Sequence, residues 1–316
     1  MIVGTRSRGR SVWATGHGLI GLVTGTAVAC HRVTVWTALL AMRQKPVTMV
    51  DFSTSLQDAK EDRSFVMALA RGLEILRAFK PQDGMLSNQE ISSRTGIPKP
   101  TVSRLTYTLT KLGYLQYSDR MERYQLGTGV LALGYSSLAS MGLRQTARPL
   151  MQELADFSGA SVSLGSRDRL SVVYLEHCQG GHALTLRLQV GSRVPVATTG
   201  IGRALLAALP QDERDYLMDH LRRRAGKEWS TVRAGVERAV AQYQELGYCT
   251  STGEWEEEVN AVGVPLALDD GSDIVAFNCG GPSFRLPTDR IHEEIGPRLV
   301  ELVATVRSRL STGEVA

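Results

Sequence analysis

The chain has few residues of the kinds that build covalent frameworks or metal clusters. It contains 4 cysteines, Cys30, Cys178, Cys249 and Cys279, and no two of them form a Cys-x-x-Cys pair. Reduced, buried thiols are therefore expected rather than disulfides. His177, Cys178 and His182 lack a fourth ligand at a spacing that zinc requires. No phosphate-binding or dinucleotide-binding glycine motif is present. The sequence predicts neither a metal nor a cofactor.

Acidic residues are absent from the first 50 positions, which contain six lysines and arginines. Three arginines precede an apolar stretch at 18–30, an order that imitates a signal peptide. The stretch is shorter than the roughly 20 apolar residues of a spanning helix. We interpret residues 1–62 as a basic extension that is either disordered or the result of a start placed too far upstream, with Met49 as the real start. A basic arm that touches DNA or a membrane is the alternative. We expect a cytoplasmic protein without a membrane partner.

Length and composition indicate two ordinary globular domains. The chain has 316 residues, of which 43% are hydrophobic and 22% charged. The net charge is only +4, so the distribution of basic residues is more informative than their total.

Residues 63–127 follow the order of elements in a winged helix-turn-helix. A helix begins near Phe65, and we expect one buried face formed by Phe65, Leu69, Leu73, Leu76 and Phe79. Ser87 and Glu90 form a capping box that opens a short helix. A turn with two prolines leads into a third helix that ends near Leu112, with a predicted buried stripe of Val102, Leu105, Leu109 and Leu112. Two short strands, 114–117 and 123–126, form a hairpin.

The third helix carries the features of a DNA-reading element. Residues 91–118 contain Arg94, Lys99, Arg104 and Lys111 and no acid, which suits a phosphate backbone. The side opposite the leucines is polar, basic and aromatic, as a helix in a major groove requires. The predicted DNA-binding residues are Ser87, Lys99, Pro100, Thr101, Ser103, Arg104, Tyr107, Lys111, Arg120 and Arg123. Alternatives are a solvated face of an ordinary helical domain or a protein-binding winged helix; the basic face favours double-stranded DNA.

The rest of the chain mixes helices and strands. We expect a linker helix at 128–143 and a second domain at 144–312. Strands are predicted at 161–164, 170–176, 184–188, 262–268 and 274–279, and helices at 203–209, 211–221, 231–246 and from Ile291 to Leu310. This pattern indicates an α+β fold with an antiparallel sheet.

Taken together, these segments resemble the IclR family of bacterial regulators. The resemblance covers about 64–310 and is carried by short motifs at 68–76 (ALARGLEIL), 96–105 (GIPKPTVSRL), 124–127 (YQLG), 191–195 (GSRVP), 199–207 (TGIGRALLA), 261–265 (AVGVP) and 280–282 (GGP). It implies a GAF-like α/β sensor domain, a homodimer or dimer of dimers, a small-molecule effector and control of catabolic genes.

The resemblance also implies where the effector binds. The effector-binding residues carried over are Thr198, Thr199, Gly200, Ile201, Ser251, Asn260, Ala261, Asn278 and Gly280. A helix start at Thr199 would offer free N–H groups to a carboxylate. Many relatives have adjacent acids soon after a Gly-Tyr pair, where this chain has Ser251-Thr252-Gly253 before an acidic run at 254–258. We expect that run to be a solvated loop. The effector class is a small carboxylate or aromatic compound.

An enzyme is the alternative from another class. GAF-like domains can carry thiol redox chemistry, with the helix-turn-helix as a vestige. A nucleophilic Cys249 or Cys279 would need a nearby base, and the sequence shows none. We expect a regulator rather than an enzyme.

Overall fold

A computed structural model describes residues 64–181, 188–268 and 274–312 of the chain. The predictions for residues 1–62, for the strand at 184–187 and for His182 lie outside these residues. Residues 64–126 are called the reader and residues 142–312 the sensor, after the roles that the sequence predicts for them.

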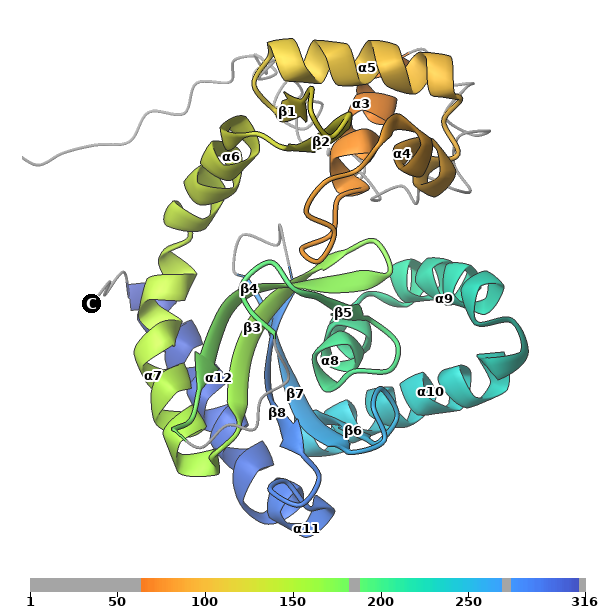
Figure 1. The fold of residues 1–316 in the computed structure, drawn as a ribbon. Helices are drawn as coiled ribbons and strands as arrows, with labels where there is room; N and C mark the ends of the chain where they lie inside the picture. Colours follow the sequence, from red (N-terminus) through yellow and green to blue (C-terminus); the bar gives the residue numbers. More distant parts are fainter. Residues whose placement is uncertain (1–63, 182–187, 269–273, 313–316) are drawn as a thin grey trace, which may run out of the picture. The chain divides into compact units, whose positions relative to one another are not determined.

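The reader has the predicted succession of three helices and a hairpin (Figure 1). Ser87 caps the second helix: its Oγ accepts the N–H of Glu90 at 3.3 Å, and the Glu90 carboxylate accepts the N–H of Ser87 at 2.8 Å. Gly96 ends that helix at φ 68°, a left-handed conformation that favours glycine. The elements are α3 (Met67–Arg77), α4 (Asn88–Thr95), α5 (Lys99–Lys111), β1 (Leu115–Ser118) and β2 (Arg123–Leu126).

The reader core differs from the predicted one on two helices. Ile75 of α3 is completely buried, whereas Leu69 and Leu73 are 61% and 53% exposed, so the predicted face of α3 is wrong in its first two turns. On α5, Val102 is buried as expected, but Leu112 is 63% exposed at the helix end. The buried core consists of Ile75, Leu86, Ile91, Ile97, Val102 and Leu115.

Two helices connect the reader to the sensor sheet. The first, α6 (Thr128–Ala139), has no buried residue although it is largely apolar. The second, α7 (Gly142–Ser158), buries one face, including Ala147 and Met151. Met141 separates them at φ −84° and ψ 88°, a backbone conformation outside the helical region. The predicted linker at 128–143 therefore contains a break between α6 and α7.

The sensor is built on a six-stranded sheet in which every neighbouring pair is antiparallel, as predicted. The strand order is β5-β4-β3-β8-β7-β6. The strands are β3 (Ser161–Asp168), β4 (Ser171–Gln179), β5 (Arg193–Pro195), β6 (Cys249–Thr252), β7 (Val259–Ala267) and β8 (Ile274–Pro282). The sequence patterns did not predict the two short edge strands, β5 and β6.

Helices cover both faces of this sheet (Figure 1). One face packs against α7 and α12, and the other against α8, which is backed by α10. A Cβ at Gly263 of β7 would lie 2.3 Å from the carbonyl oxygen of Gly200, so glycine allows α8 to approach the sheet closely. The remaining elements are α8 (Gly200–Ala208), α9 (Gln211–Ala225), η2 (Gly226–Glu228), α10 (Trp229–Leu246), α11 (Thr288–Arg290), η3 (Ile291–Ile295) and α12 (Gly296–Thr312).

A β-bulge in β4 sets which side chains face α8. The register with β3 shifts between Leu164, opposite Glu176, and Gly165, opposite Tyr174, which leaves Leu175 as the extra residue. Leu175 and Glu176 contact the α7 side, since Leu175 packs on the α7–α12 core and Glu176 pairs with Arg144 of α7. Tyr174 and His177, three positions apart, consequently share the opposite face.

Within the described residues, no helix combines the length and the apolar character needed to cross a membrane.

Candidate nucleic-acid interface and small-molecule pocket

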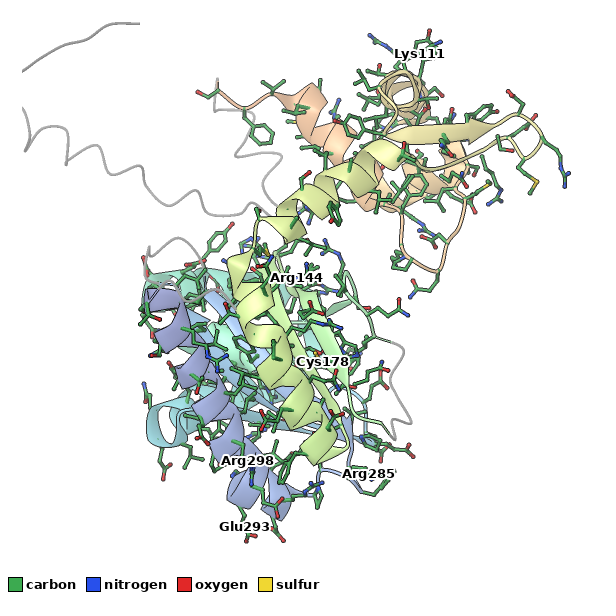
Figure 2. All side chains as sticks on the ribbon, turned by 90° about the vertical axis from the view of Figure 1, so that its left-hand side faces the viewer. Lys111, Arg144, Cys178, Arg285, Glu293 and Arg298 are labelled. Carbon is green, nitrogen blue, oxygen red and sulfur yellow. The ribbon has the colours of Figure 1, made fainter. Side chains whose placement is uncertain are left out.

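The outer face of α5 is exposed, polar and free of acids. Tyr107 is 64% exposed, and the Lys111 ammonium lies 5.5 Å from the centre of its ring. Lys111 is labelled on α5 in Figure 2. Thr106, on the inner face, is completely buried and donates back to the Val102 carbonyl at 3.0 Å. The predicted residues Lys99, Pro100, Ser103, Arg104, Tyr107 and Lys111 are all exposed, and Thr101 is half-buried.

The start of α4 is less suited to phosphate than predicted. The Ser87 hydroxyl is engaged with the Glu90 carboxylate at 2.6 Å. Hydrogen bonds from the Ser87 hydroxyl and backbone lower the pKa of Glu90, so this carboxylate is ionised at neutral pH. A negative charge already lies where a phosphate would approach. The capping role of Ser87 is clear, while its predicted contact with DNA is disfavoured.

The two arginines of the hairpin are in different environments. Arg120 is exposed in the turn between β1 and β2. Arg123 is half-buried: its Nη1 donates to the Met85 carbonyl at 3.1 Å and lies 3.2 Å from Glu90 Oε2. Arg120 is therefore free to approach a DNA backbone, whereas Arg123 helps to hold the hairpin against the helices.

A cavity of about 30 Å³ lies on the α8 side of the sensor sheet. It brings together six of the nine predicted effector residues: Thr199, Gly200, Ser251, Ala261, Asn278 and Gly280. Its other lining residues were not predicted: Ser161, Ser163, Tyr174, His177, Leu188, Trp255 and Val259. The alternation of Ser161 and Ser163 along β3 was the available signal for the first two. Tyr174 and His177 were missed because strand alternation does not place residues three positions apart on one face, and the bulge in β4 does.

The three remaining predicted residues lie beside the cavity without lining it. The Thr198 carbonyl accepts the Ser251 hydroxyl at 2.6 Å. Ile201 is completely buried in the core beneath α8. Asn260 donates through Nδ2 to the Leu286 carbonyl at 2.9 Å. Each of these three residues therefore takes part in contacts within the protein.

Polar side chains form a connected row across the cavity floor. Ser163 Oγ lies 2.8 Å from His177 Nδ1, and the rings of His177 and Tyr174 stack with centroids 5.9 Å apart. Burial raises the pKa of Tyr174 to about 12, against the effect of hydrogen bonds with Ser163 and Asn278. Asn278 is 6% exposed, and its Oδ1 has no hydrogen-bond partner among the described residues. An unsatisfied buried acceptor of this kind favours a ligand that donates a hydrogen bond.

The start of α8 forms another side of the cavity. Thr199 caps the helix: its Oγ accepts the Gly202 N–H at 3.2 Å and donates to the Pro195 carbonyl at 2.6 Å. Helix geometry leaves the N–H groups of Gly200 and Ile201 without an intrahelical acceptor. An anion at this point would meet free donors and the positive end of the helix dipole.

The acidic run at 254–258 is not wholly solvated, contrary to the prediction. Glu254 forms an ion pair with Arg203 of α8, which is 3% exposed, and a second with Arg238 of α10 at 2.6 Å. Burial opposes ionisation of Glu254, but Arg203 outweighs it and lowers the pKa of the carboxyl. Arg203 also donates to the carbonyls of Ala197 and Thr250. Through these ion pairs Glu254 anchors the β6–β7 connection, which contains the cavity-lining residue Trp255.

The described cysteines are buried and protonated. Burial raises the pKa of Cys249 to about 12 and that of Cys279 to about 11, and it also raises the pKa of Cys178, which packs in the α7–α12 core beside α7 (Figure 2). Thiols in this state are poor nucleophiles. Across the part of the chain that the structure describes, no three His, Cys, Asp or Glu side chains gather as metal ligands.

Comparisons with known proteins give consistent matches. The IclR helix-turn-helix domain matches residues 68–119, and the bacterial transcriptional regulator IclR C-terminal domain matches residues 135–309. The HTH-type transcriptional regulator TsaQ1/TsaQ2 of Comamonas testosteroni is 36% identical over 247 residues, which cover 78% of this chain and 88% of that protein. The crystal structure of an IclR family transcriptional regulator from Brucella abortus is 50% identical with a TM-score of 0.74, covering 78% of this chain and 94% of that one.

One further solved structure shares the fold at lower identity. It is an IclR homologue from Microbacterium hydrocarbonoxydans in complex with 4-hydroxybenzoate. It is 23% identical, with a TM-score of 0.62, and the match covers 78% of this chain and 99% of that one.

Proposed function

Because the chain belongs to the IclR family of bacterial transcriptional regulators, we propose that it reads an operator with α5 and senses a small organic acid in the cavity beside α8. The fold is a winged helix-turn-helix followed by a GAF-like α/β domain. The observation that carries the DNA-reading assignment is the acid-free exposed face of α5, with Ser103, Arg104 and Tyr107. Direct readout of guanine by Arg104 and phosphate contacts by Lys99 and Lys111 fit this face.

The cavity supports a carboxylate or aromatic effector. Its lining combines hydroxyl and amide groups with apolar side chains such as Trp255 and Leu188, a mixture typical of organic ligand sites. The α8 N-terminus offers donors to a carboxylate. The fold has been solved with 4-hydroxybenzoate in the Microbacterium homologue. At about 30 Å³ the cavity is small, so an aromatic acid requires it to widen.

The proposal includes the assembly and the cellular role. Exposed apolar side chains on α3 and α6, among them Leu69, Leu73, Leu131 and Tyr135, favour burial in a homodimer or a dimer of dimers. The protein would act on chromosomal DNA in the cytoplasm and control catabolic genes. The protonated, buried thiols argue against the redox enzyme considered above, and we propose that the protein has no enzymatic activity.

Two measurements test the proposal. Purified protein should bind DNA from its own upstream region in a titration that resists excess random DNA. A thermal-shift screen with acetate, succinate, benzoate and 4-hydroxybenzoate should raise the melting temperature for at least one acid, because a ligand of the native state stabilises it. Equal affinity for operator and random DNA would reject the reader assignment. A panel without any stabilising acid would reject the carboxylate assignment.

A further inference from the structure

The described residues that line the cavity carry no fixed charge that could balance an anion. Among the described residues that line it, none is Lys, Arg, Asp or Glu, and the titratable ones are Tyr174 and His177. Burial raises the pKa of Tyr174 to about 12, so its hydroxyl remains neutral under physiological conditions. Among the described lining residues, His177 is therefore the side chain that can become positively charged near neutral pH.

The hydrogen bonds of His177 indicate a neutral ring. Its Nε2 lies 3.2 Å from Gln179 Nε2, and its Nδ1 lies 2.8 Å from Ser163 Oγ. An amide nitrogen can only donate, so Nε2 accepts and the ring proton resides on Nδ1. Burial lowers the pKa of His177, which the neighbouring Glu176 partly opposes.

The charged groups around His177 are already paired with others. Glu176 accepts the backbone N–H of His177 at 3.1 Å, but its carboxylate is held on the other sheet face by Arg144 at 2.8 Å and Arg148 at 2.5 Å. From the β6–β7 connection, Glu254 is held by Arg203 and Arg238. The neighbours Ser163 on β3 and Asn278 on β8 are uncharged. Within the part of the lining that the structure describes, no fixed charge would compete with an anion for His177.

We infer that a carboxylate effector binds to this sensor together with one proton, which His177 takes up from solvent to become an imidazolium facing the anion. The inference rests on the proposed function, since it concerns the same cavity. The new Nε2–H requires an acceptor, which Gln179 supplies if its amide rotates to present Oε1. Since both ring N–H groups of His177 are then held by Ser163 and Gln179, the imidazolium acts on the anion through its charge, and the hydrogen-bond donors to the carboxylate are the free N–H groups at the start of α8. His177 is accordingly a specificity residue: it favours anionic acids over their neutral amides.

The experiment uses the full chain and isothermal titration calorimetry. Whichever acid of acetate, succinate, benzoate and 4-hydroxybenzoate binds is titrated between pH 6 and pH 8, in two buffers with different ionisation enthalpies, alongside its neutral amide. Proton uptake makes the observed enthalpy depend on the buffer. We expect affinity to fall with rising pH by up to about tenfold per unit over the range between the pKa values of the free and bound ring, because only the bound ring is then protonated. The amide should show neither effect.

His177→Gln provides the variant test, since glutamine keeps hydrogen-bonding groups but cannot be protonated. It should bind the acid with the weaker affinity that the wild type has at high pH, and with no dependence on pH. His292→Gln is the matched control: His292 Nδ1 lies 2.9 Å from the Tyr248 hydroxyl, neither residue lines the cavity, and the substitution should leave the pH dependence intact. Acid binding without proton uptake by the wild type overturns the inference and leaves the proposed function standing. If no acid binds, both the carboxylate assignment and the inference fail.

Discussion

Basic side chains in the reader differ in whether they already form hydrogen bonds or ion pairs within the protein. Arg94 is used by the fold, because it donates to the Ala78 carbonyl at 3.0 Å and to Asp83 Oδ1 at 2.9 Å. Arg104 is exposed and its guanidinium has no hydrogen bond or ion pair with any described residue. The acid-free stretch at 91–118 therefore contributes fewer free cations to DNA than its composition suggests.

Arg104→Ala should weaken operator binding by about 1–3 kcal/mol and random-DNA binding by less, since a guanidinium that reads a guanine edge contributes little elsewhere. The measurement is a fluorescence-anisotropy titration of both DNAs at fixed salt. Arg222→Ala on α9, an exposed arginine of the sensor, is the control and should change neither affinity. Equal losses for operator and random DNA would mean that Arg104 contacts only phosphate.

We expect Thr199 to influence effector binding through the helix that it caps. Its hydroxyl is fully used by the Gly202 N–H and the Pro195 carbonyl, so Thr199→Val should cost about 0.5–2 kcal/mol of stability. The loosened first turn of α8 should also weaken effector binding, while operator affinity without effector stays nearly unchanged. Thr199→Ser retains the cap and should restore both properties. Chemical denaturation and calorimetry measure the two effects; an unaltered effector affinity in Thr199→Val would contradict this account.

At the scale of elements, the β6–β7 connection depends on one carboxylate. Glu254→Gln leaves the guanidinium of Arg203, 3% exposed, without its counter-ion. We expect a loss of about 1–3 kcal/mol in unfolding free energy at pH 7, less than for a fully buried pair because Glu254 is partly exposed. Glu256→Gln, an exposed acid in the same run, should be neutral.

The pH dependence supplies a second readout for this variant. The folded-state pKa of Glu254 is lowered, so its stabilising contribution is complete above the unfolded-state pKa and is lost as the pH falls through the folded-state value. The difference between wild type and Glu254→Gln in urea denaturation should therefore shrink below about pH 4, near the ordinary pKa of a glutamate carboxyl. A difference that is constant with pH would assign the loss to packing instead.

The elements with strong local signals could be predicted from the sequence, and those set by tertiary pairing could not. The Ser87–Glu90 capping box and the two-proline entry to α5 are local, and both occur where predicted. The side of α3 that is buried depends on what packs against it, so its apolar periodicity identified the helix but misplaced Leu69 and Leu73. The bulge at Leu175 and the short strands β5 and β6 depend on register with neighbouring strands, which no window of sequence contains.

At the scale of the whole molecule, the chain passes from reader to sensor through α6 and α7. The break at Ser140 and Met141 divides two otherwise regular helices, and α7 packs directly on β4, which carries Tyr174 and His177 to the cavity. A change at the cavity can thus reach the linker through one strand and one helix. An effector alters DNA binding only if its affinity differs between two arrangements of the linker.

We predict a reciprocal coupling of about 1–3 kcal/mol between effector and operator, in the sense that each changes the affinity for the other by the same factor. Two glycines inserted between Ser140 and Met141 should abolish the coupling, because a flexible joint cannot hold the two parts in preferred arrangements. Effector affinity measured without DNA should survive the insertion. The same two glycines inserted after Gly226, in the α9–η2 turn, serve as the control and should preserve the coupling.

Operator titrations with and without a confirmed effector, on all three proteins, give the coupling directly. If the effector shifts operator affinity equally in wild type and in the linker insertion, transmission does not pass through the α6–α7 connection; if it shifts neither, the proposed sensing role must be abandoned.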